Sequence, residues 1–256
     1  MSELLVERRG AVAVFTLNRP GQLNAMNSSM MQALEARVAE FDADPKLRVG
    51  IVAGAGRAFC AGADLKAMAE RHQSGVPSRF STAKLAGLAL SMSPKPFIAA
   101  INGLAVGGGC ELALDCDLRI CSAEAYFALM EPRRGLLAGY AIHHLPRVIG
   151  AAAANQMLLT AQKVSASQAL AWGLVSEVHA PEALMLRAFE LAEAIAANAP
   201  LSIVGTKAAA QVWRKALIER SLEAGQQHWD RVQASEDARE GARAFVEKRI
   251  PVWRGR

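Results

Sequence analysis

The sequence of 256 residues predicts a layered α/β core followed by a helical C-terminal region. Three observations support this fold class. Up to about residue 150, short apolar runs typical of buried strands alternate with helical patterns, and glycine-rich turns follow several of these runs. Beyond Gly150 the pattern is almost wholly helical. Because 52% of the residues are apolar, a sizeable core can be buried.

Near the N-terminus the pattern predicts one strand and one helix. Residues 6–18 alternate in the manner of a β-strand and end in a turn signal rich in Asn, Pro and Gly. Ser28 or Ser29 is expected to cap the helix that follows. Its buried face would carry Met30, Leu34, Val38 and Phe41.

The central part is predicted to alternate strands with short helices. Strands are expected at residues 49–54, 96–101, 118–121 and 125–129, and short helices at 65–68 and 110–115. A break at 198–200 interrupts the C-terminal helices. We therefore expect a core over residues 1–199 and a separate helical region over residues 200–256.

The charge balance is mildly basic, with a formal net charge of +5. Much of the excess lies at residues 239–256, where Glu240 and Glu247 interrupt the basic side chains, as is typical of a solvated helix. A dense lysine run and aromatic residues interleaved with basic ones are both missing from the sequence, so nucleic acid is not the expected partner. A phosphorylated substrate would also suit this charge.

The four cysteines contain no C-x-x-C pair and lie among apolar neighbours, so we expect buried, reduced thiols as in a cytosolic protein. The N-terminus has no basic region followed by an apolar run, and therefore does not resemble a signal peptide. The apolar stretch at 85–109 is broken by Pro94, Lys95 and Pro96, so no membrane span is expected. Together these features predict a cytoplasmic protein.

Several cofactor motifs fail in this sequence. Residues 54–59 resemble a dinucleotide-binding G-x-G-x-x-G, but Phe59 stands where the third glycine belongs. His143 and His144 are adjacent and have no nearby ligands at metal spacing. We therefore expect neither a metal nor a redox cofactor.

Two small-residue loops, each after a predicted strand, are the strongest candidates for a site. Gly107, Gly108 and Gly109 precede a short helix, and their backbone can approach a ligand closely. The earlier loop, residues 61–64, also precedes a predicted helix, which Asp64 is expected to cap. Two such loops could present two amides to one oxygen, as stabilisation of a thioester enolate requires.

Two glutamates lie close to these loops in the sequence. Glu111 follows the glycines, and Glu131 follows a predicted strand and precedes Pro132. Each has an ordinary structural explanation: Glu111 as a first-turn acid and Glu131 as a loop acid. Together, beside an oxyanion site, they could position one water and divide the proton transfers, provided that their pKa values differ.

The stretches 59–65 and 101–113 closely resemble the two signature loops of the enoyl-CoA hydratase/isomerase (crotonase) family. The similarity extends from 17–20 through 23–26 to 241–249, nearly the whole chain. It implies a crotonase-type spiral of repeated ββα units, with a C-terminal helical region used in oligomerisation. A homotrimer or a dimer of trimers is then expected.

The resemblance also implies a set of site residues. It assigns the oxyanion hole to the backbone N–H groups of Ala63 and Gly108. Coenzyme A, which is part of the substrate and not a separate cofactor, and the acyl group would contact Gln22, Ala25, Ala61, Asp64, Leu65 and Gly139. Phe245 and Lys248 would reach the CoA of a neighbouring subunit.

The matching positions of hydratases in this family both carry acids, as Glu111 and Glu131 do here. The resemblance therefore favours addition of water across a 2-trans-enoyl-CoA to give a 3-hydroxyacyl-CoA. Both glutamates would hold the water, and Glu131 would supply the proton at C2. Dehydration of a more polar, carnitinyl-type thioester and double-bond isomerisation are alternatives. A more remote alternative is RNA binding, because some members of the family bind RNA.

The chain departs from the family pattern around the second glutamate. Met130 replaces the usual proline, and Pro132 is expected to restrict Glu131 toward extended angles. Where the family is often glycine-rich, residues 139–143 carry bulk. Tyr140 or His143 is therefore expected to narrow the acyl pocket.

Overall fold

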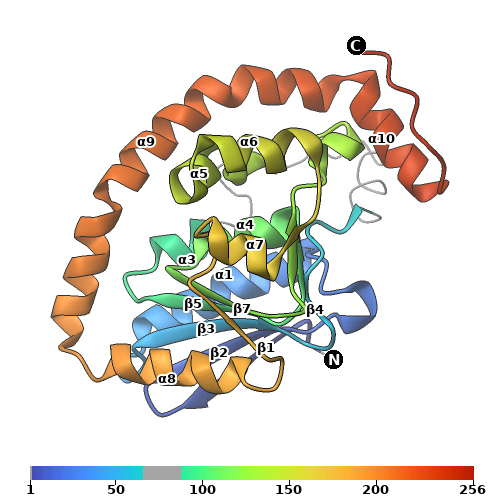
Figure 1. The fold of residues 1–256 in the computed structure, drawn as a ribbon. Coiled ribbons are helices and arrows are strands. Elements are labelled where there is room, and N and C mark those ends of the chain that lie inside the picture. The colour runs from blue at the N-terminus through green and yellow to red at the C-terminus, as the bar shows by residue number, and fades with distance from the viewer. Residues whose placement is uncertain (1, 66–87) are drawn as a thin grey trace.

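A computed structural model describes residues 2–65 and 88–256, with residues 88 and 213–224 described by their backbone alone. In these segments two β-sheets and the helices form layers (Figure 1). The α/β fold expected from the sequence is confirmed. The helix expected at 65–68 falls almost wholly outside the described residues.

The described strands form two sheets. The larger has the order β1-β2-β3-β5-β7-β10, with β1 (Leu4–Arg9), β2 (Val12–Leu17), β3 (Val49–Gly54), β5 (Phe97–Ile101), β7 (Leu118–Ser122) and β10 (Glu177–His179). The smaller has the order β4-β6-β8-β9, with β4 (Ala58–Cys60), β6 (Leu104–Val106), β8 (Tyr126–Ala128) and β9 (Val164–Ser165). Only the β1–β2 and β8–β9 pairs of these sheets are antiparallel.

From β3 to β8, consecutive strands alternate between the two sheets. In the pairs β3–β4, β5–β6 and β7–β8, the first strand joins the larger sheet and the second joins the smaller one. A helix follows the later pairs: α4 (Gly108–Asp115) after β6, and the 3-10 helix η3 (Glu131–Arg134) with α5 (Gly139–Ile149) after β8. This repetition is the predicted spiral of ββα units. It brings the segments after β4, β6 and β8 to the same edge.

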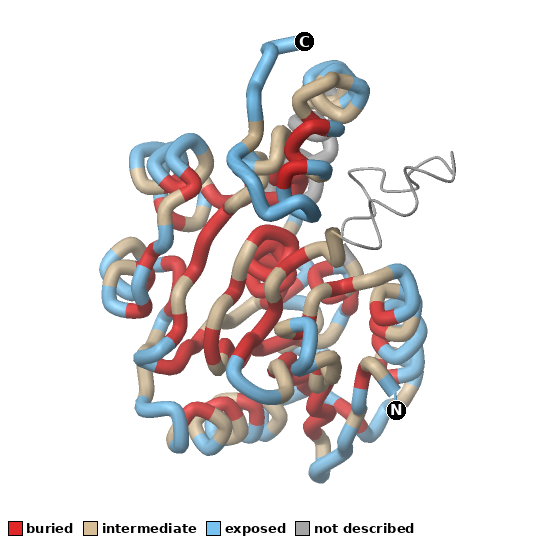
Figure 2. Tube along the Cα trace, turned by 90° about the vertical axis from the view of Figure 1, so that its right-hand side faces the viewer, coloured by how far each residue is buried: buried red, intermediate tan, exposed pale blue. Residues whose placement is uncertain are grey.

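Helices cover both faces of the larger sheet. On one face, α1 (Ser28–Ala43), α3 (Leu88–Met92) and α4 enclose the main core, and α8 (Leu184–Ala196) packs on the other (Figures 1 and 2). The predicted apolar face of α1 is buried as expected. Its Phe41 ring packs against Phe15 and Phe97 at centroid distances of 5.7 and 5.1 Å. These contacts fasten α1 to the larger sheet.

Two N-terminal predictions need correction. Residues 6–18 are not one strand but parts of the β1–β2 hairpin, which turns at Gly10 with φ +56°. Alternation continues through such a turn, because both strands share one buried face. The cap of α1 is Asn27, whose Oδ1 accepts the N–H of Met30 at 2.8 Å, and not a serine.

The C-terminal part is helical, as predicted, apart from the short strands β9 and β10. It contains α6 (Ala151–Thr160), α7 (Ala166–Ala171), α8, the long α9 (Pro200–Ala234) and α10 (Glu236–Val246). The predicted break falls between α8 and α9. In Figure 1, α9 arches from α8 to α10 on the opposite side of the molecule. Within the described residues, no helix is long and apolar enough to cross a membrane. All four cysteines are free and buried, as expected.

Candidate active site

A cavity of about 510 Å³ opens where the segments after β4, β6 and β8 meet. Its wall includes every predicted site residue except Lys248, namely Gln22, Ala25, Ala61, Ala63, Asp64, Leu65, Gly108, Glu111, Glu131, Gly139 and Phe245. Residues from six separate stretches of sequence therefore share one cavity.

The two small-residue loops pack directly on each other. Gly62 has φ +93°, and a Cβ there would lie 2.7 Å from the Val106 carbonyl oxygen. A Cβ on Gly109 would lie only 2.1 Å from the Cys60 carbonyl oxygen. Glycine is required at both positions because the backbones touch. This contact brings the start of α4 alongside residues 61–64.

The two loops bring the backbone N–H groups of Ala63 and Gly108 to the cavity wall. Met26 pairs with the loop through its own N–H to the Gly62 oxygen at 2.7 Å and through the Asp64 N–H to its carbonyl at 2.9 Å. In such a parallel bridge the N–H of Ala63 points the other way. Gly108 is the first residue of α4, where N–H groups lack an intrahelical acceptor. A Cβ on Gly108 would lie 3.6 Å from the Ala63 nitrogen, so the two groups are close.

Glu111 is nearly fully buried in the first turn of α4. Its Oε1 accepts the N–H of Ala141 at 2.9 Å, at the start of α5. Burial raises the pKa of Glu111, while the N–H groups of Ala141 and Tyr140 act in the opposite direction by favouring the carboxylate. The bulky segment at 139–143 thus supplies a helix N-terminus aimed at this acid.

Glu131 is the first residue of η3, so its backbone is helical and not extended as Pro132 had led us to expect. Proline is tolerated there because the first N–H groups of a helix have no partner to lose. One carboxylate oxygen, Oε2, is buried without a hydrogen-bond partner among the described residues. Burial and the nearby Glu111 charge raise the pKa of Glu131 to about 8.

The two acids therefore have different surroundings in one cavity. Glu111 has backbone donors that stabilise its charged form, whereas Glu131 has an unpaired oxygen and a like charge beside it. When one proton is shared by such a pair, it resides preferentially on Glu131. The two acids of the cavity therefore differ in how strongly they hold a proton.

Asp64 has a partner that the sequence did not indicate. Its Oδ2 accepts a hydrogen bond from Arg19 at 3.0 Å, and the helix that it was expected to cap lies outside the described residues. Arg19 also donates to the Ala25 carbonyl at 2.5 Å. Buried Asn24 donates to the Ala55 and Ala58 carbonyls. These bonds hold residues 19–26 against the loop that precedes Asp64.

The cavity wall includes residues that sequence reasoning missed. Arg134, Leu136 and Leu137 follow Glu131, and Trp229 and Gln233 come from one face of α9. A residue spacing of four on α9 marks a shared face, but only the arch of that helix shows what the face meets. Tyr140 and His143, expected to narrow the acyl pocket, do not line the cavity. Tyr140 is buried in the core because α5 directs it inward.

The two C-terminal residues differ in position. Phe245, on α10, lines the cavity of its own chain, whereas Lys248 is exposed and lies outside the wall. Phe245 therefore needs no neighbouring subunit to reach a site. Contact of either residue with the CoA of another subunit stays a prediction.

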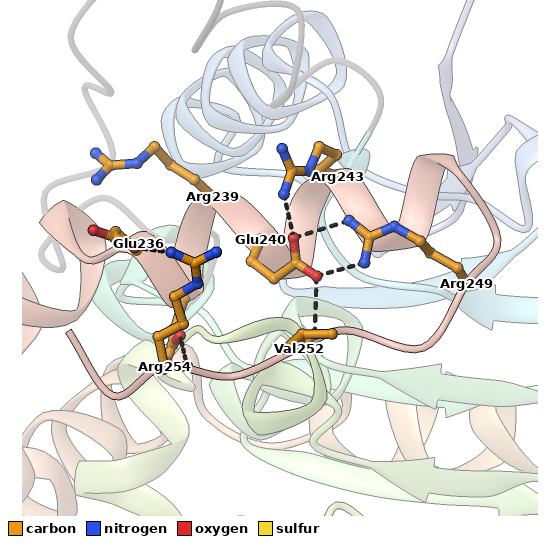
Figure 3. A pocket seen from close by; sticks show the side chains of 8 residues that line it. Glu236, Arg239, Glu240, Arg243, Arg249, Val252 and Arg254 are labelled. Atoms are coloured by element: carbon orange, nitrogen blue, oxygen red, sulfur yellow. Dashed lines mark hydrogen bonds and ion pairs between the residues drawn. The ribbon is translucent and has the colours of Figure 1, made fainter.

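A second hollow, of about 610 Å³, lies on the outer side of α10 beneath the C-terminal tail (Figure 3). Glu240 is its centre: it accepts from Arg243 at 2.7 Å, from the Val252 N–H at 2.9 Å and from Arg249 through both oxygens. These donors hold the pKa of Glu240 far below its usual range. Asp237 accepts the N–H groups of residues 254 and 255. These hydrogen bonds and ion pairs hold the C-terminal tail against α10.

Comparison with known proteins agrees with this architecture. The family described as enoyl-CoA hydratase/isomerase matches residues 7–256. An (E)-benzylidenesuccinyl-CoA hydratase of Thauera aromatica is 41% identical over 251 residues, which cover 95% of this chain and 96% of the relative. A carnitinyl-CoA dehydratase of Proteus mirabilis is 42% identical over 259 residues, covering 97% of both. A solved carnitinyl-CoA dehydratase from Mycobacterium avium superposes with a TM-score of 0.89 at 37% identity, over all of both chains.

The spiral of ββα units and its solved relatives define a crotonase-fold protein. More particularly, the chain belongs to the enoyl-CoA hydratase/isomerase family. Its similarity to enzymes that add or remove water on CoA thioesters supports a hydro-lyase.

Proposed function

We propose that the protein hydrates a 2-trans-enoyl-CoA to a 3-hydroxyacyl-CoA. The observation that carries this proposal is the unequal pair of buried acids in one cavity, Glu111 with a backbone donor and Glu131 with an unpaired oxygen. Addition of water to a conjugated thioester needs one group to accept a proton and another to donate one. The pair meets that need without a further group.

In the proposed reaction, both glutamates hold the water. Ionised Glu111 takes a proton as the water oxygen bonds to C3. The C2=C3 electrons move toward the thioester carbonyl, and Glu131 donates its proton to C2. The N–H groups of Ala63 and Gly108 stabilise the negative charge on the thioester oxygen, the kind of contribution expected of an oxyanion hole. Gln22, Ala25, Ala61, Asp64, Leu65 and Gly139 would contact the CoA and acyl groups.

Loss of the ultraviolet absorbance of the conjugated enoyl thioester tests the proposal, on straight-chain 2-enoyl-CoAs of increasing length. Formation of the 3-hydroxyacyl-CoA should match the loss of substrate. A 3-enoyl-CoA assayed in parallel distinguishes isomerisation, because it gains conjugation where hydration loses it. If no 2-enoyl-CoA is consumed, the proposal is wrong.

A second candidate is the reverse reaction on a more polar substrate, dehydration of a carnitinyl-type 3-hydroxyacyl-CoA. The 42% identity to a carnitinyl-CoA dehydratase favours it. The same acids would act with their protonation states exchanged. Carnitinyl-CoA and a simple 3-hydroxyacyl-CoA, compared by kcat/KM, decide between the two substrates.

A homotrimer or dimer of trimers remains our expectation for the assembly. Support comes from α9, whose Leu201 and Val212 are 88% and 67% exposed in the single chain. Apolar side chains so exposed on one helix suit a subunit interface. Sedimentation analysis of the purified protein measures the subunit number directly.

A further inference from the structure

Arg134 lies in the cavity wall, on the same side of the 3-10 helix η3 as Glu131. It is the last residue of η3, three positions after Glu131. A 3-10 helix has three residues per turn, so side chains at this spacing project from the same side. Their backbone positions are offset by roughly 6 Å, from a rise of about 2.0 Å per residue. The guanidinium can therefore approach a group several atoms from the carbons beside Glu131.

The Arg134 guanidinium has no anionic partner among the described residues. Its contact is with the ring of Phe245, 4.4 Å from the guanidinium carbon to the ring centroid. Two other partly buried arginines are paired with carboxylates: Arg19 with Glu3 and Asp64, and Arg249 with Glu240. Burial, together with neighbouring Arg133, lowers the pKa of Arg134. A half-buried cation without a counter-charge is costly, and an anion from a ligand would offset that cost.

Two glycine contacts fix the position of this arginine. A Cβ on Gly135 would lie 2.4 Å from the Asp237 carbonyl oxygen, and one on Gly241 would lie 2.0 Å from the Arg134 carbonyl oxygen. The backbone of η3 thus rests directly on α10, the helix that also carries Phe245. Guanidinium and ring are positioned before a ligand binds, which limits the entropy lost on binding.

The other charged groups of the cavity are accounted for. Asp64 is paired with Arg19, Glu111 accepts from Ala141, and Glu131 is held largely protonated at neutral pH. The nearby wall is apolar, with Met130, Leu136, Leu137 and Trp229. In the described part of this wall, Arg134 is the one cation, and it is available to a ligand.

We propose that Arg134, backed by Phe245, binds a carboxylate on the acyl group of the substrate. The preferred substrates are then 2-enoyl-CoAs whose acyl chain ends in a free carboxylate a few bonds beyond C3. This inference rests on the proposed hydratase function and specifies its substrate class. Guanidinium matches a carboxylate through two parallel hydrogen bonds, which lysine cannot reproduce.

The kinetic test compares matched pairs of thioesters that differ in the terminal group. Glutaconyl-CoA is paired with 2-pentenoyl-CoA, and 2,3-dehydroadipyl-CoA with 2-hexenoyl-CoA. We expect a higher kcat/KM for the acidic member of at least one pair. R134Q should lower the acidic-to-neutral ratio about 10–100-fold, the usual worth of a charge-assisted contact. R134K should retain part of it, and the exposed neighbour variant R133Q should leave the ratio unchanged.

A binding measurement separates this inference from the hydratase proposal. Calorimetry with adipoyl-CoA and hexanoyl-CoA, which cannot be hydrated, reports the subsite even if no enoyl-CoA is turned over. We expect R134Q to weaken adipoyl-CoA selectively. If hexanoyl-CoA weakens equally, Arg134 serves a CoA phosphate and the inference is overturned. An unchanged ratio in R134Q would overturn it too. Circular dichroism and Tm establish that each variant is folded.

Discussion

The candidate active-site cavity and the hollow beneath the C-terminal tail are similar in size, but their carboxylates have opposite environments. In the cavity, Glu131 has a buried oxygen without a partner and a pKa raised to about 8. In the hollow, Glu240 is surrounded by donors and its pKa is depressed. Pairing makes an acid structural, whereas isolation keeps it reactive and costs stability.

The largest effect is expected for Glu131→Gln. Turnover should fall roughly 10²–10⁴-fold, the usual contribution of general acid–base catalysis, with CoA binding almost unchanged. A continuous absorbance assay of enoyl-CoA consumption measures the loss of turnover. The exposed acid variant Glu124→Gln is the control and should behave as wild type. Near-normal turnover in Glu131→Gln would remove the proton-donor role.

The same variant should alter stability in a pH-dependent way. Since the folded pKa is about 8 and the ordinary value 4.5, the folded state binds an extra proton between these pH values, and the free energy of unfolding falls as pH rises through them. Glu131→Gln removes the contribution of Glu131 to this slope. At pH 8 its Tm should exceed that of wild type by roughly 3–6 °C. A lower Tm would mean that the buried acid stabilises the fold.

Glu111→Gln should cost a similar factor in turnover, about 10²–10⁴. A neutral amide cannot accept the proton of the attacking water. In the double variant with Glu131→Gln, the loss should be far smaller than the product of the single losses, because the two acids act as a unit. Single-turnover kinetics of the three variants provide the test. Multiplicative losses would indicate that the acids act independently.

A smaller effect, on stability and not on turnover, is expected for Glu240→Gln. The tail would lose its charged anchor, so Tm should fall by roughly 2–6 °C while turnover changes little. Because the folded pKa is depressed, the stabilisation is present above the ordinary value of 4.5 and is lost as pH falls below it. Glu247→Gln, which removes only an exposed partner of Arg249, is the control. Equal losses in both variants would contradict a special role for Glu240.

The smallest effect is expected for Lys248→Ala, the predicted CoA contact that lies outside the cavity. Its Michaelis constant should rise a few-fold, by roughly the worth of one exposed charge contact, and more than turnover falls. Because charges at the surface are screened by salt, the rise should shrink as ionic strength increases. A loss confined to turnover would count against contact with a CoA phosphate.

The sequence predicted the parts of the site that depend on local chemistry. Small residues allow a ligand to approach the backbone closely, and this predicted a site at residues 107–109 and 61–64. The spacing of its apolar residues predicted the buried face of α1. The hairpin turn at Gly10 was missed because alternation does not stop at a turn. Asn27 was overlooked because two serines follow it and the sequence does not show which residue has extended backbone.

The rest of the site depends on long-range packing. Trp229 and Gln233 reach the cavity only because α9 arches across the molecule, which no local pattern encodes. The bulk at Tyr140 and His143 suggested a narrowed pocket, but the direction of α5 turns Tyr140 into the core and its amides toward Glu111. Arg134 became a candidate only through its place in the cavity wall and its contact with Phe245, where the Gly135 and Gly241 contacts pack η3 on α10.

That glycine contact also orders events during synthesis. The strands and both glutamates leave the ribosome well before α10. That helix is translated about a hundred residues after Glu131, which takes roughly 5–20 s at about 5–20 residues per second. Until Gly241 seats on the Arg134 carbonyl, the acids face an unfinished wall that water can enter. A nascent chain would thus acquire its sheet first and complete the wall of its cavity last.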